Sequence, residues 1–427
     1  MSIVFAILIF SAVILFHEFG HFLLARKNGI IVNEFSLGMG PRILSFEKNG
    51  TRYSWKLIPL GGSCAMAGED TSDTSEGTFH SASVWGRIAV VAAGPVFNFI
   101  LAFAAALVII GIGGYNPAKV MEVTKGSAAE KAGLQEGDVI TRYQGYSIDL
   151  GKDLYIYTYL NEPTEDTVYL QVKRDGEKME IVYDPDVEVR YLLGFNRASA
   201  DAMEIASLIP GMGLEEAGAK AGDVITEING VDVPDGEAYD AYIQKHPLDG
   251  TPVLITYVRD GLEYETEVIP MEYRTPDLGF SYYLGTEKAN LLQTIQYSAV
   301  EVKYMIRTTI LSLKELLTGH LGVEELSGPV GVVSAIEETY EETRKEGPLI
   351  TFLSMMNMLL LLSANLGVMN LLPIPALDGG RLVFLIIEAI RGKPIDRELE
   401  GGVHFAGMML LLALMAFVMY NDIAKLL

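Results

Sequence analysis

The chain has 427 residues and a formal net charge of −23, and half of its residues are hydrophobic, a high share for a soluble protein. Such an acidic chain lacks the basic surface that nucleic-acid phosphates require, so nucleic acid is excluded as a partner. Cys64 is the single cysteine, which excludes an intramolecular disulfide and a four-cysteine zinc site. The length allows several domains.

Four apolar stretches are long enough to cross a bilayer. The first lacks a basic N-terminal region and a small-residue cleavage site, so we interpret it as a retained helix and not as a signal peptide. The predicted organisation is a first span at 1–27, a loop with a β-hairpin at 28–85, a second span at 86–114, repeated modules at 115–196 and 197–275, an amphipathic helix at 285–320, a third span region at 350–390 and a fourth span at 403–420.

The orientation follows from the basic residues that flank the spans. Arg26 and Lys27 begin the first loop, and the loop at 391–402 carries Arg391, Lys393 and Arg397. Positive flanks stay in the cytoplasm. Both ends of the chain and the acidic insert between the second and third spans are therefore expected on the outer side.

The first span carries the motif His17-Glu18-Phe19-Gly20-His21. Its spacing places two imidazoles one turn apart on one helix face, where both can bind one zinc ion, and the intervening Glu can act as a general base on water. Charged residues in a membrane helix are costly and indicate a function. We therefore expect a zinc protease whose site lies within the bilayer.

Asp378 is the predicted third ligand. It stands in the segment Asn370-Leu371-Leu372-Pro373-Ile374-Pro375-Ala376-Leu377-Asp378-Gly379-Gly380, at the end of the third span. The prolines break the helix there, and both polar clusters are expected near the inner end of their helices, so Asp378 can reach the metal. Two His and one carboxylate leave an open position, as catalytic zinc requires. An N-cap for the helix that follows is the simpler role for Asp378, and the two roles are compatible.

The insert contains a repeat with a period of about 85 residues. Residues 132–141, AGLQEGDVIT, recur as AGAKAGDVIT at 217–226, and a turn follows each copy. Two tandem modules of one small fold are predicted. They resemble PDZ domains, which bind an extended peptide along a sheet edge. The Leu-Gly-Phe triplets at 193–195 and 278–280 resemble the PDZ loop that holds a peptide C-terminus, although ordinary strand residues explain them equally well.

Two further segments have open roles. Residues 43–46 and 53–58 flank Asn49-Gly50, the signal of a tight hairpin turn. The hairpin could hold an unwound substrate along its edge or be purely structural. The apolar period at 291–317 predicts an amphipathic helix that lies on the membrane surface or packs on the modules.

Together these motifs resemble the site-2 protease family, most closely the bacterial regulator-of-sigma-E protease type with tandem PDZ domains. The resemblance includes the Gly-Pro segments at 38–41, 94–95 and 328–331 and spans nearly the whole chain. It implies a multi-domain membrane protein in which four transmembrane α-helices form a zinc intramembrane protease core with two inserted PDZ-like β-rich domains. His17, His21 and Asp378 would be ligands of Zn²⁺, Glu18 the catalytic base, and Asn370, Pro373 and Pro375 substrate contacts.

The resemblance also implies partners and a place. The substrates would be single-pass membrane proteins such as anti-sigma factors, or remnant signal peptides, in the bacterial inner membrane, with the PDZ domains on the extracytoplasmic side. The alternatives are a catalytically silent PDZ scaffold, which needs no metal ligands, and a transporter, which four spans without an inverted repeat disfavour. The other histidines, His80, His246, His320 and His404, are expected to be dispensable for zinc.

Overall fold

The computed structural model describes the chain except residues 1, 70, 72, 320–321, 323–326 and 427. It forms two compact units. One comprises residues 1–116 and 285–427, and the other comprises residues 117–284. The first unit is mainly helical and the second is rich in strands, so each unit has its own core.

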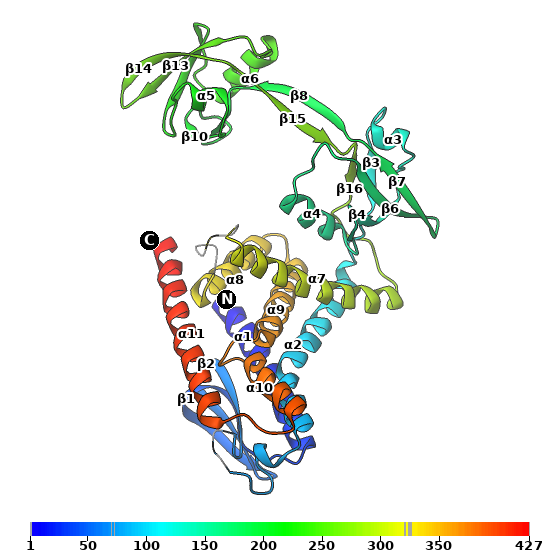
Figure 1. Ribbon diagram of the computed structural model, residues 1–427, viewed down its shortest axis with the longest axis vertical. Coiled ribbons are helices and arrows are strands. Elements are labelled where there is room, and N and C mark those ends of the chain that lie inside the picture. The colour runs from blue at the N-terminus through cyan, green and yellow to red at the C-terminus, as the bar shows by residue number, and fades with distance from the viewer. Residues whose placement is uncertain (1, 70, 72, 320–321, 323–326, 427) are drawn as a thin grey trace. The chain divides into compact units, whose positions relative to one another are not determined.

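Among the residues that the structure describes, four helices of the first unit are long and apolar enough to span a membrane, which confirms the four predicted spans. They are α1 (Ser2–Lys27), α2 (Val84–Gly113), α9 (Pro348–Leu371) and α11 (Arg397–Leu426). Within the bundle, α1, α2 and α9 pack against one another, with α7 (Leu291–Leu317) and α8 (Pro329–Thr343) beside them (Figure 1). Large apolar side chains such as Ile3, Leu8 and Ile100 stay exposed, as expected for a surface that faces lipid.

The amphipathic helix predicted at 285–320 corresponds to α7. Its apolar face joins the helical core through Val302 and Met305 and contacts α2 and α9. Residue 320, and with it His320, lies outside the described residues.

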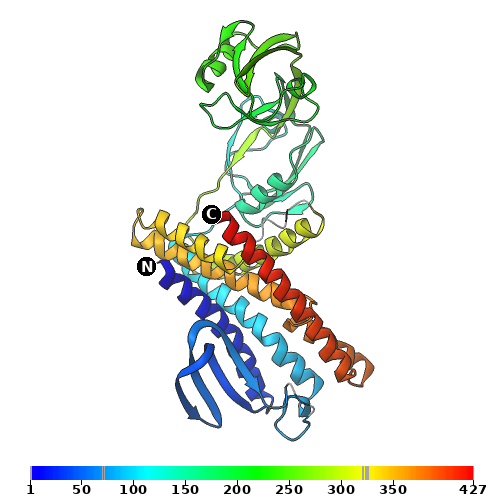
Figure 2. The ribbon, with the colours of Figure 1, turned by 90° about the vertical axis from the view of Figure 1, so that its left-hand side faces the viewer.

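The predicted hairpin consists of β1 (Val32–Lys48) and β2 (Thr51–Met66), a two-stranded antiparallel sheet beside α1 (Figure 2). Asn49 and Gly50 have φ of 53° and 74°, which the tight turn requires. Phe22 of α1 packs against Phe35 and Tyr53 of the two strands, with ring centroids 5.2 and 6.0 Å apart. Aromatic packing therefore fixes the hairpin to α1.

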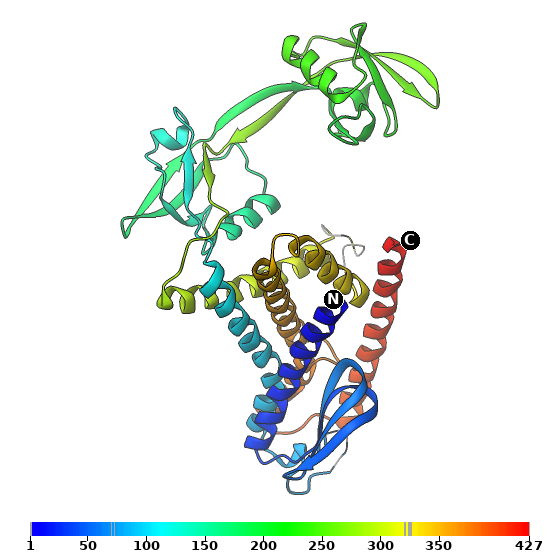
Figure 3. The same cartoon turned by 180° about the vertical axis from the view of Figure 1, so that it is seen from behind.

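The last span is attached to the bundle at two places. Asp422, near the end of α11, accepts hydrogen bonds from the backbone N–H groups of Gly328 (3.1 Å) and Gly331 (2.8 Å), at the beginning of α8. A carboxylate there satisfies helix N–H groups that have no partner inside the helix. The second place is Gly407, where an added Cβ would come 2.4 Å from the Cβ of Pro375. Figure 3 shows α11 from the opposite side.

The second unit contains two modules with the same strand order. The sheet of the first module is β5-β4-β6-β7 and that of the second is β12-β11-β13-β14. The elements of the first module are β3 (Val120–Val123), α3 (Ala128–Lys131), β4 (Val139–Tyr143), β5 (Tyr146–Ser147), α4 (Gly151–Leu160), β6 (Val168–Arg174), β7 (Glu177–Tyr183) and β16 (Phe280–Tyr282). Those of the second are β9 (Phe195–Arg197), β10 (Ile205–Leu208), α5 (Gly213–Glu216), β11 (Val224–Ile228), β12 (Val231–Asp232), α6 (Gly236–Lys245), β13 (Val253–Arg259) and β14 (Leu262–Val268). The repeat in the sequence is therefore a repeat of structure.

The second module is inserted into the first. Strand β16 pairs with β3, and Leu278 and Phe280 pack on the first core, although they follow the second module in sequence. Leu193 and Phe195 belong to the second core. The predicted bounds of 115–196 and 197–275 put the triplet 193–195 in the first module and left 278–280 outside both, whereas the structure packs 193–195 on the second core and 278–280 on the first. Strands β8 (Asp186–Leu192) and β15 (Met271–Asp277) pair as the ribbon that leads into and out of the insertion.

An equivalent ion pair fixes the Gly-Asp turn of each module. Arg174 binds Asp138 through Nε and Nη2, both at 2.7 Å, and Arg259 binds Asp223 at 2.7 and 2.6 Å. Both Asp residues are 1% exposed, and each also accepts a backbone N–H from the turn before it. The hydrogen bonds from Arg259 lower the pKa of Asp223.

Asp223→Asn is expected to destabilise the second module, because it removes the carboxylate that accepts two hydrogen bonds from Arg259 and one from the backbone of the turn. In the native protein, the folded pKa of Asp223 lies below its unfolded value near 4. Ionised Asp223 therefore contributes its full stabilisation to the folded state above about pH 4. This stabilisation is lost as the pH falls through the folded pKa. The measurement is the free energy of unfolding of wild type and variant between pH 7 and pH 3. A stability difference that stays constant over this range would contradict the assignment.

Candidate metal centre

The structure brings together the three predicted ligands. His17 and His21 lie on α1 with their Nε2 atoms 3.2 Å apart, and Asp378 Oδ2 lies 3.2 and 3.4 Å from these two nitrogens. Tetrahedral ligands about 2.0–2.1 Å from zinc are about 3.3 Å from one another. The three atoms are therefore spaced to hold one zinc ion.

The chemistry of the donors agrees with this spacing. Each imidazole is 8% exposed, and Asp378 Oδ2 is a buried acceptor to which no described group donates a hydrogen bond. A buried carboxylate oxygen without a donor is costly unless a cation is bound. No other group of three or more His, Cys, Asp or Glu within the described ranges is spaced to hold a metal ion.

Residues of helix α2 orient both imidazoles through their Nδ1 atoms, on the side away from the ligating Nε2 atoms. His21 Nδ1 lies 2.9 Å from the carbonyl oxygen of Val90, which can only accept, so Nδ1 carries the proton and Nε2 is free to bind metal. His17 Nδ1 lies 3.3 Å from the side-chain amide of Asn98, which is completely buried. The structure faces Asn98 Nδ2 toward this nitrogen, and Asn98 Oδ1 is buried with no partner among the described residues. Interchanging the oxygen and nitrogen of the amide gives Oδ1 a donor: Asn98 then accepts the Nδ1 proton and leaves His17 Nε2 for the metal.

Two glycines allow the helices to approach closely enough for these contacts. A Cβ on Gly94 of α2 would lie 2.4 Å from His21 Nε2 and 2.7 Å from His17 Cε1. A Cβ on Gly20 of α1 would lie 2.4 Å from the carbonyl oxygen of Ala93. Any side chain at position 94 would therefore displace the ligands themselves.

Glu18 lies next to the hairpin, because a Cβ on Gly62 of β2 would come 3.2 Å from Glu18 Cγ. The Gly61-Gly62 segment thus lets β2 pass close to the side chain that stands between the two imidazoles in sequence. The hairpin is consequently part of the surroundings of the site.

Asp378 is the first residue of α10 (Asp378–Arg391), and the N-cap position belongs to Leu377. The simpler N-cap role predicted for Asp378 is therefore wrong. Gly379 and Gly380 permit this turn, since a Cβ on either would meet a backbone oxygen of Leu372 or Ile374 within 2.4 Å.

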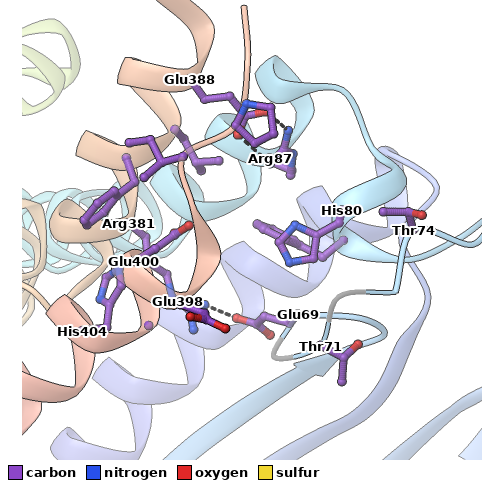
Figure 4. Close-up of a pocket in the computed structure, with 16 residues that line it drawn as sticks. Glu69, Thr71, Thr74, His80, Arg87, Arg381, Glu388, Glu398, Glu400 and His404 are labelled. Atoms are coloured by element: carbon purple, nitrogen blue, oxygen red, sulfur yellow. Dashed lines mark hydrogen bonds and ion pairs between the residues drawn. The ribbon is translucent and has the colours of Figure 1, made fainter. Parts of the chain in front are cut away.

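Polar contacts hold α10 on its far side. Arg87 of α2 binds Glu388 through two hydrogen bonds of 3.1 and 2.6 Å, and Arg381 pairs with Glu69. These pairs line a cavity of about 560 Å³ (Figure 4). None of the three ligands lines it, so it is separate from the metal site.

The three predicted substrate contacts lie in or next to the break between α9 and α10. Asn370 is in the last turn of α9, Pro373 is exposed, and Pro375 packs against Gly407 of α11. No contact with the ligands distinguishes them, and their role stays a prediction.

Sequence reasoning gave no role to Asn98 and Gly94. Asn98 could have been noticed in the sequence, because it is an amide side chain in the middle of a 30-residue apolar helix. Polar residues are costly to place in a membrane span and usually have a function there. Nothing in the sequence alone shows that Gly94 faces the imidazoles, because that depends on how α1 and α2 pack.

A buried His-His-Asp cluster among apolar spans, together with two PDZ-like modules, defines an intramembrane zinc metalloprotease. Comparison with known proteins agrees. Residues 5–414 match peptidase family M50. The zinc metalloprotease RasP of Geobacillus kaustophilus is 34% identical over 99% of this chain and 98% of its own length. The regulator of sigma-W protease RasP of Bacillus subtilis is 32% identical over 98% and 97%. The chain belongs to peptidase family M50, and its cofactor is zinc.

One solved structure, the HtrA3 PDZ domain bound to a phage-derived ligand, is similar to a part of the chain. The match covers 21% of this chain and 93% of that domain, with 15% identity and a TM-score of 0.18.

Asn98→Leu is expected to lower the affinity for zinc about 10- to 100-fold, the usual effect of removing a partner that orients a metal-bound histidine. Zinc competition with a chelator measures this affinity in the purified protein. Asn365→Leu is the control, because Asn365 is also an asparagine in a span but its partner is Thr309, at 2.6 Å. Equal zinc affinities for the two variants would show that Asn98 does not orient His17.

Proposed function

We propose that this protein cuts the membrane-spanning segments of single-pass membrane proteins, with His17, His21 and Asp378 as zinc ligands and Glu18 as the general base. The observation that carries the proposal is the spacing of 3.2–3.4 Å among the three ligating atoms, beside a glutamate and among apolar helices. A silent scaffold or a transporter needs no such set.

Zinc, when bound, polarises the scissile carbonyl and makes a water molecule acidic enough to be deprotonated near neutral pH. Glu18 takes that proton and returns it to the leaving amine. Val90 and Asn98 keep the imidazole protons on Nδ1, away from the ligating nitrogens.

A substrate helix hides its carbonyl groups in its own hydrogen bonds, so it must unwind before hydrolysis. The hairpin supports the proposal that an unwound segment pairs with it. Residues 62–66 of β2 pair with residues 32–37 of β1 as an outer segment of the sheet, and Gly62 in this segment lies beside Glu18. Backbone pairing along such an edge replaces the hydrogen bonds that the substrate helix loses.

The name of one relative supports the proposed substrate class. The B. subtilis relative is named for the regulation of sigma-W, which supports anti-sigma-factor-like substrates, and remnant signal peptides are a second class. With both chain ends outside, the modules lie on the extracytoplasmic side of the bacterial inner membrane, where they restrict access of substrates with large outer domains.

Glu18→Gln is expected to abolish cleavage while retaining zinc, because glutamine keeps the shape of the side chain but cannot accept the proton from water. The measurements are zinc content and the cleavage rate of one membrane substrate in detergent. Removal of zinc from the wild type with a chelator should give the same loss of cleavage, restored by added zinc. Cleavage by Glu18→Gln at the wild-type rate would refute the role of this residue as the base.

Deletion of residues 117–284 is expected to reduce selectivity more than activity. This deletion removes the whole second unit, including β16, and all four zinc-site residues lie outside it. A bulky substrate with its outer domain intact should be cleaved by the deleted enzyme and refused by the full chain. The comparison is the cleavage of one substrate with and without that domain by both enzymes. If both enzymes discriminate equally between the substrate with its outer domain and the substrate without it, the modules do not filter substrates. They would then serve as a docking site or a structural support.

A further inference from the structure

The turn that precedes Asp378 contains a backbone conformation that L residues rarely adopt. Ala376 has a φ of +77°, in the left-handed region, where a residue with a side chain is uncommon. It lies two residues before the ligand, between Pro375 and Leu377. Such a conformation persists only where the surrounding structure holds it. The contacts of Ala376 are therefore relevant to the position of Asp378.

His404 of α11 provides such a contact. The backbone N–H of Ala376 donates to His404 Nδ1 at 2.9 Å. Because Nδ1 accepts, the ring proton is on Nε2. The Nε2 atom is buried, and no described group is its hydrogen-bond partner. The ring lies against Phe384 of α10, with centroids 5.4 Å apart, and lines the cavity of Figure 4.

A second contact holds the same turn. A Cβ on Gly407, one turn after His404, would lie 2.4 Å from Pro375 Cβ and 2.6 Å from its carbonyl oxygen. Helix α11 thus touches two consecutive residues of the turn, one by packing and one by a hydrogen bond. The metal ligands come from α1 and α10, so this contact connects a span without ligands to the metal site.

We propose that His404 is a positioning residue for the zinc site, which holds the Ala376 turn so that Asp378 faces the two imidazoles. This role rests on the proposed function, in which Asp378 is a ligand. It revises the expectation that His404 is dispensable for zinc. His404 does not bind the metal, because its Nδ1 is used by Ala376 and it is not part of the ligand cluster.

The experiment compares three substitutions that differ in the acceptor they offer. In His404→Asn the amide oxygen can occupy the place of Nδ1 and accept the Ala376 N–H. In His404→Gln the oxygen is one bond farther from the backbone, near the place of Nε2, and His404→Leu has no acceptor. The readouts are the rate at which purified full-length protein loses zinc to an excess of chelator, and kcat and KM for one membrane substrate.

The His404→Leu and His404→Gln variants are expected to lose zinc about tenfold faster than the wild type, in the range seen when a partner of a metal ligand is removed. Both variants should also have a lower kcat with KM nearly unchanged. Asn is expected to restore both values to near those of the wild type. The control is His80→Leu, which removes another histidine from the wall of the same cavity and should change neither value. Thermal unfolding of each variant checks its folding, and the Asn–Gln comparison suffices if the Leu variant does not fold.

Zinc loss at the wild-type rate in His404→Gln would overturn the proposal. So would equally fast loss in the Asn and Gln variants, because the ring and not the acceptor would then matter. Asp378→Ala separates this result from the proposed function. If Asp378→Ala loses its zinc while His404→Gln is normal, only the positioning role fails. If Asp378→Ala keeps its zinc, the ligand assignment itself fails, and the positioning role with it.

Discussion

The structure depends on keeping three metal-binding groups close together inside an apolar helix bundle. Two imidazoles and a carboxylate are costly to bury unless they bind a cation or one another. They stand 3.2–3.4 Å apart, although His17 and Asp378 are separated by most of the chain. The bundle must therefore join the first span to the break after the third with an accuracy of a few tenths of an ångström.

Small residues and backbone breaks make that closeness possible. Gly94 and Gly20 let α2 touch α1, so that Val90 and Asn98 reach the outer nitrogens of the imidazoles. The prolines after α9 end the helix, and Gly379 and Gly380 let α10 begin immediately beside the turn. Gly20, Gly94, Gly379 and Gly380 are thus the places where the backbones around the site approach one another most closely.

The elements around this centre differ in how firmly they are held. The hairpin is fixed by the packing of Phe35 and Tyr53 on Phe22, whereas the side chains of Ile43, Leu44 and Phe46 in β1 remain exposed. Helix α11 is held near its two ends, by Asp422 and by His404 with Gly407. The hairpin and α11 are thus tied to the helical core at a few defined contacts.

The sequence by itself determined the local chemistry. Spacing alone placed His17 and His21 on one face, hydropathy identified the four spans, and the repeat identified two similar modules. Those features depend on residues near one another in the chain, where helical geometry and turn propensity decide. Only the tertiary structure decided the rest. The insertion of one module into the other depends on the pairing of β16 with β3, which no local pattern encodes. The contacts of Asn98 and His404 depend on which faces of α2 and α11 turn inward. In an apolar span, the side that faces lipid and the side that faces protein have similar composition, so that rotation is fixed by packing.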